Sequence, residues 1–223
     1  MAHTVIIVAG GSGLRFGAAL PKQFVNLSGR PILMHTIEVF YRFDSRLQLI
    51  VVLPASHRET WLSLCQEHRF TVPHQVVDGG AERFHSVKAG ISVMDPDGWV
   101  AIHDAVRPLV SRQTLERCIH TCIEAGSAVP AVPLSDSLRR LVDGGSVPLN
   151  RNEFRLVQTP QCFQKKWVLG MYNQPYDPSF TDDASVAEKH GLSIQLCEGN
   201  TENIKITHPS DLIWAEALIQ NGL

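Results

Sequence analysis

The amino-acid sequence predicts an α/β domain with a doubly wound, mostly parallel sheet. Runs of β-branched residues, the first from Val5 to Val8, alternate with segments that carry apolar residues at helical spacing. Most of these runs end in a turn that contains glycine or proline. Hydrophobic residues make up 44% of the 223 residues and charged residues 19%, which suits one domain with a full core. We therefore expect residues 1–223 to form a single domain, with residues 134–155 as a subregion.

The expected elements alternate along the chain. Strands are expected at residues 5–8, 47–53, 75–77, 99–103 and 194–198. Helices are expected at residues 31–40, 56–70, 165–172, 182–190 and 209–219, and two more are centred on Val87 and Cys118. Ser56 and Ser111 have the side chains of N-caps, and Gly126 ends the helix that Ser111 begins. That helix matches the template of an apolar face at Leu115, Cys118, Ile119, Cys122 and Ile123, so its two cysteines are expected to pack in the core.

Three loops fall at the carboxyl ends of the expected strands. They are the glycine-rich loop after the first strand, DGGAER at residues 78–83 and HDAVRP at residues 103–108. In a doubly wound sheet, ligands bind at this edge. The sequence therefore predicts that these three loops form one site.

The glycine-rich loop favours a nucleoside triphosphate. Gly10, Gly11 and Gly13 allow backbone N–H groups to approach an anion closely, and Arg15 and Lys22 add positive charge. A dinucleotide-binding motif would need glycine at position 16 and an acid near position 53, where the chain has phenylalanine and leucine. A P-loop would need Gly-Lys followed by serine or threonine, but Lys22 lies between proline and glutamine. Both of those motifs are therefore excluded.

Residues 134–155 differ from the rest of the chain. The segment SDSLRRLVDGGSVPLNRNEF reads as two short polar strands around Asp143-Gly144-Gly145. A hairpin that cannot bury a face by itself is marginal in water. We expect it to be an arm that joins two copies of the chain as a homodimer.

Composition and charge indicate which binding partners and which cellular compartment to expect. A net charge of −2 gives no basic excess for a nucleic-acid backbone, so no nucleic acid is expected. The start of the chain lacks a signal-peptide pattern and no apolar run reaches membrane-spanning length, so we expect a cytoplasmic protein that has no membrane partner. Five scattered cysteines without a CxxC pair indicate reduced thiols.

Six blocks of sequence, taken in order, resemble one enzyme family. They are AGGSGLRFGAALPKQF, DGGAERFHSV, HDAVRP, VQTPQ, TDDAS and NIKIT, which together span nearly the whole chain. The chain resembles the cytidylyltransferases of the nucleotide-diphospho-sugar transferase fold, within them the 2-C-methyl-D-erythritol 4-phosphate cytidylyltransferases of non-mevalonate isoprenoid biosynthesis. The resemblance implies transfer of CMP from CTP to methylerythritol phosphate, giving CDP-methylerythritol and pyrophosphate, with Mg2+. It also implies a Rossmann-like nucleotidyltransferase fold.

The resemblance agrees with the chemistry that the residues allow. A phosphate monoester is already an anion at neutral pH, so its attack on the α-phosphorus needs positive charge and no protein base. Arg15, Lys22 and Lys205 are the expected catalysts, because they could stabilise the charge of the transition state. One carboxylate supplies too few ligands to hold Mg2+ by itself. Mg2+ is therefore expected to bind mainly the triphosphate, with Asp104 as its candidate protein ligand.

The resemblance implies two sets of binding residues. Nucleotide contacts are expected from Ala9, Gly10, Gly11, Gly13, Gly80 and Ser86. Substrate contacts are expected from Asp104, Arg107, Ser137, Arg151, Thr159 and Thr181. Ser137 and Arg151 lie on the arm and should serve the site of the neighbouring subunit. The chain departs from the family at Ala81, where aspartate is common, and at Ser137, where threonine is usual.

Two other interpretations remain open. A ribitol 5-phosphate cytidylyltransferase would share the glycine-rich loop, HDAVRP and TPQ, whereas LNRNEFRLVQTPQ resembles the isoprenoid enzyme. A nucleotide-binding module without turnover would not require Arg15, Lys22, Asp104 and Lys205 together. His103 is expected to be a structural hydrogen-bonding residue.

Overall fold

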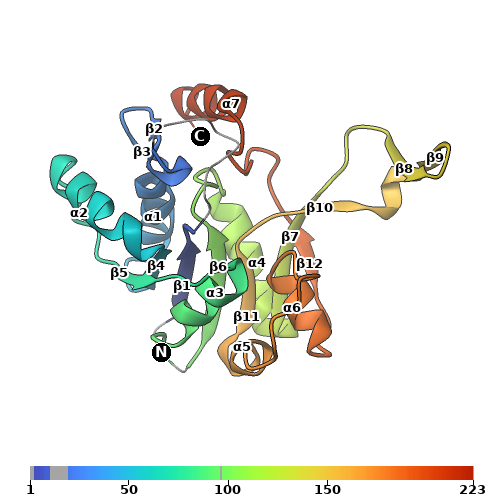
Figure 1. Ribbon diagram of the computed structural model, residues 1–223, viewed down its shortest axis with the longest axis horizontal. Helices are drawn as coiled ribbons and strands as arrows, with labels where there is room; N and C mark the ends of the chain where they lie inside the picture. The colour runs from blue at the N-terminus through green and yellow to red at the C-terminus, as the bar shows by residue number, and fades with distance from the viewer. Residues whose placement is uncertain (1–2, 11–19, 96, 223) are drawn as a thin grey trace.

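The computed structural model describes residues 3–10, 20–95 and 97–222. It shows a body built on one central sheet, from which a long hairpin projects (Figure 1). Within those residues, no helix combines the length and the apolar character needed to cross a membrane.

One half of the sheet is entirely parallel. β1 (Thr4–Val8) lies between β4 (Gln48–Leu53) and β6 (Trp99–Asp104), and β5 (Gln75–Asp78) lies next to β4. The register places Val8 beside Val52 and Asp104. The carboxyl ends of β1 and β6 are therefore adjacent, as a doubly wound sheet requires.

The other half of the sheet is mixed. β11 (Gln161–Gln164) runs antiparallel to both β6 and β7 (Ser127–Pro133), and β10 (Arg155–Val157) runs antiparallel to β7. β12 (Leu196–Glu198) pairs with β7 in parallel. The sequence predicts no strand at SAVPAVP, the segment of β7, because small residues and prolines are uncommon inside strands. The expectation of a mostly parallel sheet is confirmed.

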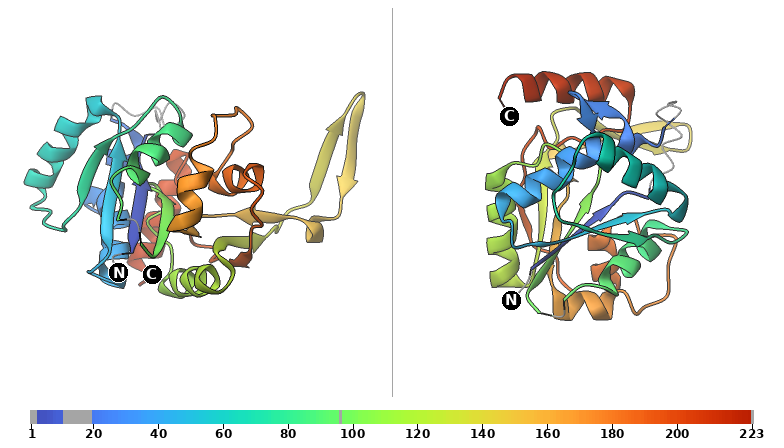
Figure 2. Two further views of the ribbon diagram at one scale, coloured as in Figure 1. Left: turned by 90° about the horizontal axis from the view of Figure 1, so that it is seen from below. Right: turned by 90° about the vertical axis from the view of Figure 1, so that its left-hand side faces the viewer.

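Helices cover both faces of the sheet, as the phase of β1 shows. Val5 and Ile7 belong to the core under one set of helices, and Ile6 belongs to the core under the other. The first set is α1 (Ile32–Phe43), α2 (Arg58–Glu67) and α4 (Arg112–Ala125). The second set is α3 (Arg83–Ile91), α5 (Lys165–Met171) and α6 (Asp183–Lys189). Figure 2 shows the two layers from two further directions.

The last helix, α7 (Pro209–Gln220), lies outside these layers. It packs through Ala215 on a small core with Leu27, Ile32, Val106 and Ile206. Leu27 comes from the short ribbon formed by β2 (Asn26–Leu27) and β3 (Arg30–Pro31). This third core holds the segment before α7, which carries Lys205, against the end of β6.

Two details of the helices differ from expectation. α2 begins at Arg58 after a 3-10 turn at Ala55–His57, so Ser56 is inside that turn and is not an N-cap. In α4, the Ser111 side chain does accept from the backbone N–H of Thr114, and Gly126 ends the helix in the left-handed region at φ 89°. The prediction for Ile123 is wrong, because it is 61% exposed on the side of α4 that faces solvent.

Cysteines behave as the sequence indicates. All five are free thiols. Cys118 and Cys122 are fully buried in the core beside Leu115, which confirms their packing role.

The hairpin consists of β8 (Leu138–Val142) and β9 (Gly145–Leu149), which pair only with each other among the described strands. It is connected to the body through β10 and the 3-10 turn at Arg151–Glu153. The left view of Figure 2 shows it extending well beyond the body. Leu141 is 85% exposed at its tip, so the hairpin leaves apolar surface uncovered within one chain.

Candidate active site

A cavity of about 270 Å3 opens at the carboxyl ends of β1 and β6. Its wall includes Ala9, Gly10, Lys22, Gly80, Ser86, Asp104 and Lys205. These residues come from the three loops that the sequence analysis placed at one edge, together with the segment before α7. Arg15, Gly11 and Gly13 lie outside the described residues, so their expected roles remain predictions.

Close packing joins the loop after β5 to the glycine-rich loop. The Ser86 hydroxyl accepts from the Gly80 backbone N–H at 3.2 Å and lies 3.5 Å from where a Cβ on Gly10 would sit. A Cβ on Gly79 would lie 2.8 Å from that hydroxyl, and one on Gly80 would overlap Cβ of His85. Glycine at positions 79 and 80 therefore permits this approach, which leaves backbone groups facing the cavity.

Gln23 connects the end of β1 to the turn that carries Lys22. Gln23, in the 3-10 turn Lys22–Phe24, is buried and donates from Nε2 to the Ala9 carbonyl at 2.9 Å. This bond holds the end of β1 against the turn that carries Lys22. Lys22 consequently lines the cavity beside the backbone of Gly10.

Asp104 is the centre of a charged cluster. Its Oδ2 lies 3.0 Å from Nζ of Lys205 and 3.4 Å from Nε of Arg107, and its Oδ1 lies 3.7 Å from Nε of Arg83. Burial by itself raises the pKa of Asp104, but Arg83, Lys205 and Arg107 outweigh it and hold that pKa well below its usual range. Asp104 is therefore ionised at any physiological pH.

Arg107 serves mainly to hold its own loop. Its Nη1 donates to the Asn203 carbonyl at 2.6 Å while its Nε contacts Asp104. Its side chain is 13% exposed, and burial lowers its pKa. Arg107 thus ties the segment before α7 to the end of β6.

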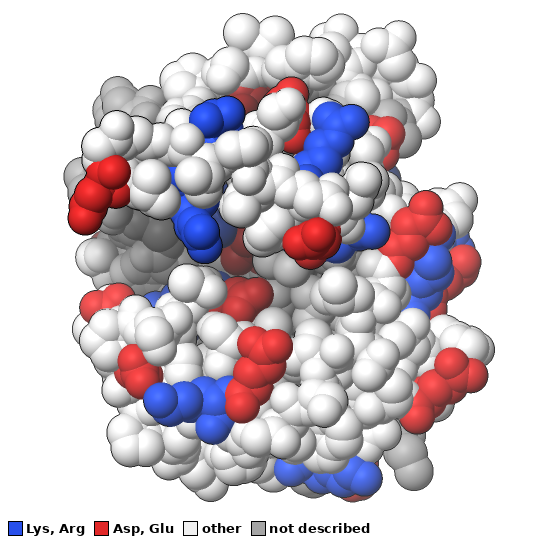
Figure 3. All heavy atoms as spheres, turned by 90° about the vertical axis from the view of Figure 1, so that its right-hand side faces the viewer, with Lys and Arg blue, Asp and Glu red and all other residues white. Residues whose placement is uncertain are grey.

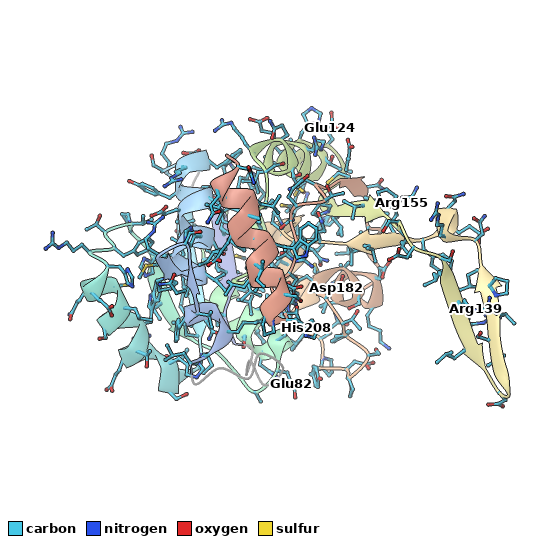
Figure 4. The ribbon with its side chains drawn as sticks, turned by 90° about the horizontal axis from the view of Figure 1, so that it is seen from above. Glu82, Glu124, Arg139, Arg155, Asp182 and His208 are labelled. Carbon is cyan, nitrogen blue, oxygen red and sulfur yellow. The ribbon has the colours of Figure 1, made fainter. Side chains whose placement is uncertain are left out.

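A second cavity of about 160 Å3 adjoins the first. The two share Arg83, Asp104 and Lys205 as a common wall. The second is also lined by Arg107, Thr159, Thr181 and Asp182. In Figure 4, Glu82 of the first cavity and Asp182 of the second lie on the body of the molecule. The expected nucleotide contacts Ala9, Gly10, Gly80 and Ser86 thus line the first cavity. The expected substrate contacts Arg107, Thr159 and Thr181 line the second, and Asp104 lies in the wall of both.

Thr159 is bound to the strand that carries Asp104. His103 Nε2 lies 3.0 Å from the Arg107 carbonyl, which can only accept, so the ring proton is assigned to Nε2. His103 Nδ1 then accepts from the Thr159 hydroxyl at 3.0 Å, and that hydroxyl accepts from the Asp104 N–H at 3.1 Å. Burial lowers the pKa of His103 to about 4, which keeps the ring neutral. This network positions Asp104, and His103 is structural as expected.

The arm residues are elsewhere. Ser137 and Arg151 are exposed and line neither cavity of their own chain. Arg151 donates to the Ser135 carbonyl within the arm. Figure 4 places Arg139 on the hairpin, far out from Glu82 and Asp182. The expectation that arm residues serve a neighbouring subunit stays a prediction.

Arg83 is a site residue that the sequence analysis did not single out. It donates from both Nη atoms to the carboxylate of Asp183, at 2.8 and 2.7 Å, and lines both cavities. Its position in DGGAER, one of the three loops at the binding edge, was the sequence feature that could have identified it. The sequence does not show whether an arginine binds a ligand or a carboxylate of the protein, and Asp183 is 100 residues away in the sequence.

The described residues suit Mg2+ only weakly. They include no group of three or more histidine, cysteine, aspartate or glutamate side chains arranged as a metal site. Oxygen ligands suit Mg2+, but Oδ2 of Asp104 already binds Lys205 and Arg107. Among the described residues, Oδ1 of Asp104 is therefore the oxygen at the shared wall that could join ligands supplied by a triphosphate.

One face of the molecule carries charges of both signs. In Figure 3, lysine and arginine side chains lie beside aspartate and glutamate side chains on that face, and neither sign covers it alone.

Comparison with known proteins identifies the family. A family model described as 2-C-methyl-D-erythritol 4-phosphate cytidylyltransferase matches residues 3–221. A protein of that name from Bacteroides thetaiotaomicron is 48% identical, over 98% of this chain and 100% of its own. One from Bacillus velezensis is 36% identical, over 99% of this chain and 97% of its own.

Solved structures agree over the full length. The 4-diphosphocytidyl-2C-methyl-D-erythritol synthase of Anaerococcus prevotii is similar with a TM-score of 0.82 and 26% identity, covering 98% of both chains. The 2-C-methyl-D-erythritol 4-phosphate cytidylyltransferase of Thermus thermophilus has a TM-score of 0.78 and 30% identity, covering 99% of this chain and 100% of its own. Sequence and fold agree, and the chain belongs to the 2-C-methyl-D-erythritol 4-phosphate cytidylyltransferase family.

Proposed function

We propose that the protein transfers CMP from CTP to 2-C-methyl-D-erythritol 4-phosphate and releases pyrophosphate. The observation that carries this proposal is the pair of cavities that meet at Asp104 and Lys205. A transferase for two anionic substrates needs two adjoining spaces with positive charge where they meet. The full-length relatives named for this activity support the same reaction.

CTP occupies the first cavity in this proposal. Backbone groups of Ala9 and Gly10 and the Gly80–Ser86 pair contact the nucleotide, as do Gly11 and Gly13. Ala81 also lines the cavity and presents only a methyl group, so cytosine recognition at this position depends on main-chain groups. Mg2+ supplies further positive charge to the triphosphate when bound.

The polyol phosphate occupies the second cavity. Asp104, Arg107, Thr159 and Thr181 surround it, with Asp104 accepting from a substrate hydroxyl. Its phosphate oxygen attacks the α-phosphorus of CTP as an anion, the new P–O bond forms, and the bond to the β-phosphate breaks. Lys22, Lys205 and Arg15 stabilise the charge on the five-coordinate phosphorus. No protein base takes a proton in this step.

The working unit in this proposal is a homodimer. Residues 1–223 form one nucleotidyltransferase domain, and residues 134–155 are the arm that reaches the partner. Exposed Leu141, Phe154 and Leu156 supply apolar surface along the arm and its base. Ser137 and Arg151 then contact the substrate in the partner's second cavity. This arrangement explains why they do not line the second cavity of their own chain.

Pyrophosphate release tests the proposal. The purified protein is incubated with CTP and Mg2+, with methylerythritol phosphate, ribitol 5-phosphate or no acceptor. We expect rapid release with methylerythritol phosphate, and little with the other two. Faster release with ribitol 5-phosphate would assign the protein to that substrate. CTP binding without release under any condition would indicate a nucleotide-binding module and contradict the proposal.

A further inference from the structure

Arg83 lies between two carboxylates at the wall that the two cavities share. Its two Nη atoms bind Asp183, and its Nε faces Oδ1 of Asp104 at 3.7 Å. The side chain is 29% exposed, and it opens toward both cavities. One guanidinium therefore connects a buried anion to the anion at the centre of the site.

Asp183 is a firm anchor for this guanidinium. It is fully buried at the start of α6 and lines neither cavity among the described residues. The Tyr172 hydroxyl donates to its Oδ1 at 2.5 Å. Burial, together with the charge of Asp183, raises the pKa of Tyr172 well above its usual value, so this tyrosine keeps its proton and remains a donor.

The backbone around Asp183 is held as well. Asp182 caps α6 by accepting from the Ser185 N–H at 2.9 Å. Gln161 of β11 donates to Asp182 and accepts from the N–H of Ala184, both at 2.8 Å. The anchor is thus fixed to the sheet on both sides, and a two-pronged bond to a fixed carboxylate leaves the guanidinium little freedom.

Positive groups contact both oxygens of Asp104. Lys205 and Arg107 contact Oδ2, and Arg83 faces Oδ1. At 3.7 Å the Arg83 contact is electrostatic and not a direct hydrogen bond, so Oδ1 keeps the capacity to accept from a ligand. With Arg83 in place, the carboxylate has a preferred orientation, and Lys205 has a fixed counter-ion.

We propose that Arg83 is a positioning residue for cytidylyl transfer: Asp183 and Tyr172 fix its guanidinium, which fixes Asp104 and thereby Lys205 at the shared wall. This inference rests on the proposed function, because it assigns Arg83 to that reaction. Two other roles are weighed against it. As a phosphate ligand, Arg83 would use the N–H groups that the two bonds to Asp183 do not occupy, and its loss would then weaken CTP binding. A purely structural ion pair would leave turnover unchanged.

The test separates turnover from CTP binding and from stability. Arg83→Lys keeps the charge but loses the fork, Arg83→Gln also loses the charge, and Tyr172→Phe removes only the hydroxyl that holds Asp183. For each variant and the wild type, kcat is measured by pyrophosphate release, the CTP dissociation constant by equilibrium dialysis, and the melting temperature by calorimetry. Arg30→Lys is the matched control, because Arg30 also makes a two-pronged pair, with Glu38, but lines neither cavity.

We expect Arg83→Lys to lower kcat about 30-fold and Arg83→Gln about 100-fold, because a small displacement of charged groups costs a large factor in rate. Tyr172→Phe should lower kcat about 3-fold to 10-fold. CTP affinity should stay within about 3-fold in all of them, and Arg30→Lys should change neither quantity.

Several outcomes would overturn the inference. Unchanged kcat in folded Arg83→Lys and Arg83→Gln would show a structural role only. A large loss of CTP affinity with normal kcat would make Arg83 a ligand contact. If both Arg83 variants fail to fold, Tyr172→Phe decides alone, and its unchanged kcat would refute the positioning role. If the wild type releases no pyrophosphate, the proposed function is wrong, and so is the inference that rests on it. If the wild type is active, the variants test the role of Arg83 alone.

Discussion

The two halves of the sheet differ in how they obtain their structure. The parallel half, β6-β1-β4-β5, has its central strands buried on both faces and carries the first cavity. The mixed half, with β7, β10, β11 and β12, contributes to the second cavity and continues into the exposed arm. In the first half β1, β4 and β6 are buried within one chain, whereas the arm that continues from the second half leaves Leu141 85% exposed. If the proposed homodimer forms, we expect nucleotide binding to belong to the single chain and acceptor binding to depend on assembly.

Truncation of an apolar side chain to alanine should destabilise the protein much more in the parallel half than in the arm. Ile50 is fully buried in β4, so Ile50→Ala should reduce the free energy of unfolding by about 2–5 kcal/mol. Leu141 is 85% exposed, so Leu141→Ala should change that free energy little but weaken the dimer. Urea unfolding and sedimentation equilibrium measure the two effects. Equal destabilisation by both substitutions would show that the arm folds as part of the body.

Lys22 tests the chemistry of the first cavity. Lys22→Ala should lower kcat by about 100-fold or more, with a much smaller loss of CTP affinity, because its charge acts mainly in the transition state. Lys88→Ala is the matched control, since Lys88 is exposed on α3 and lines neither cavity. An unchanged kcat in Lys22→Ala would remove this lysine from the mechanism.

Glycines in the two regions should respond differently to a methyl group. Gly80→Ala should weaken CTP binding by about 10-fold, because its Cβ would overlap His85 and displace the loop. Gly145→Ala in the hairpin is the control, since no described atom lies within 4 Å of its Cβ position. Calorimetric titration with CTP measures both. Normal affinity in Gly80→Ala would mean that the loop adjusts without loss.

Mixed dimers test the assembly of the second cavity. Lys22→Ala and Arg151→Ala chains are each expected to be defective, and unfolding and refolding them together should restore about a quarter of wild-type activity. Half of the randomly paired dimers are hybrids, and each hybrid has one site in which both residues are intact. Activity that stays at the level of the separate variants would place Arg151 in the site of its own chain.

Sequence patterns found the parallel half well and the mixed half poorly. Continuous apolar runs such as β4 follow from burial on both faces, and Ser111 and Gly126 mark the ends of α4 by local chemistry. β7 was not predicted from the sequence, because its residues do not favour a strand. It is extended because it pairs with β10, β11 and β12. Ile123 matched the helical template but faces solvent, because the spacing defines a stripe and the packing decides how much of it is covered.

The sequence by itself determined the α/β fold, the loops that bear the site, and Lys22 and Asp104 as neighbours at one edge, and the family resemblance added Lys205. The fold and the loops follow from local periodicity and from the rule that the carboxyl ends of parallel strands lie at one edge of the sheet. Short segments of sequence are therefore enough to predict them. Only the tertiary structure decided that Arg83 binds Asp183, that Thr159 is engaged with His103, and that two cavities share one wall. Each of these facts joins residues far apart in sequence, and hydrogen bonds and charges act through distance in space.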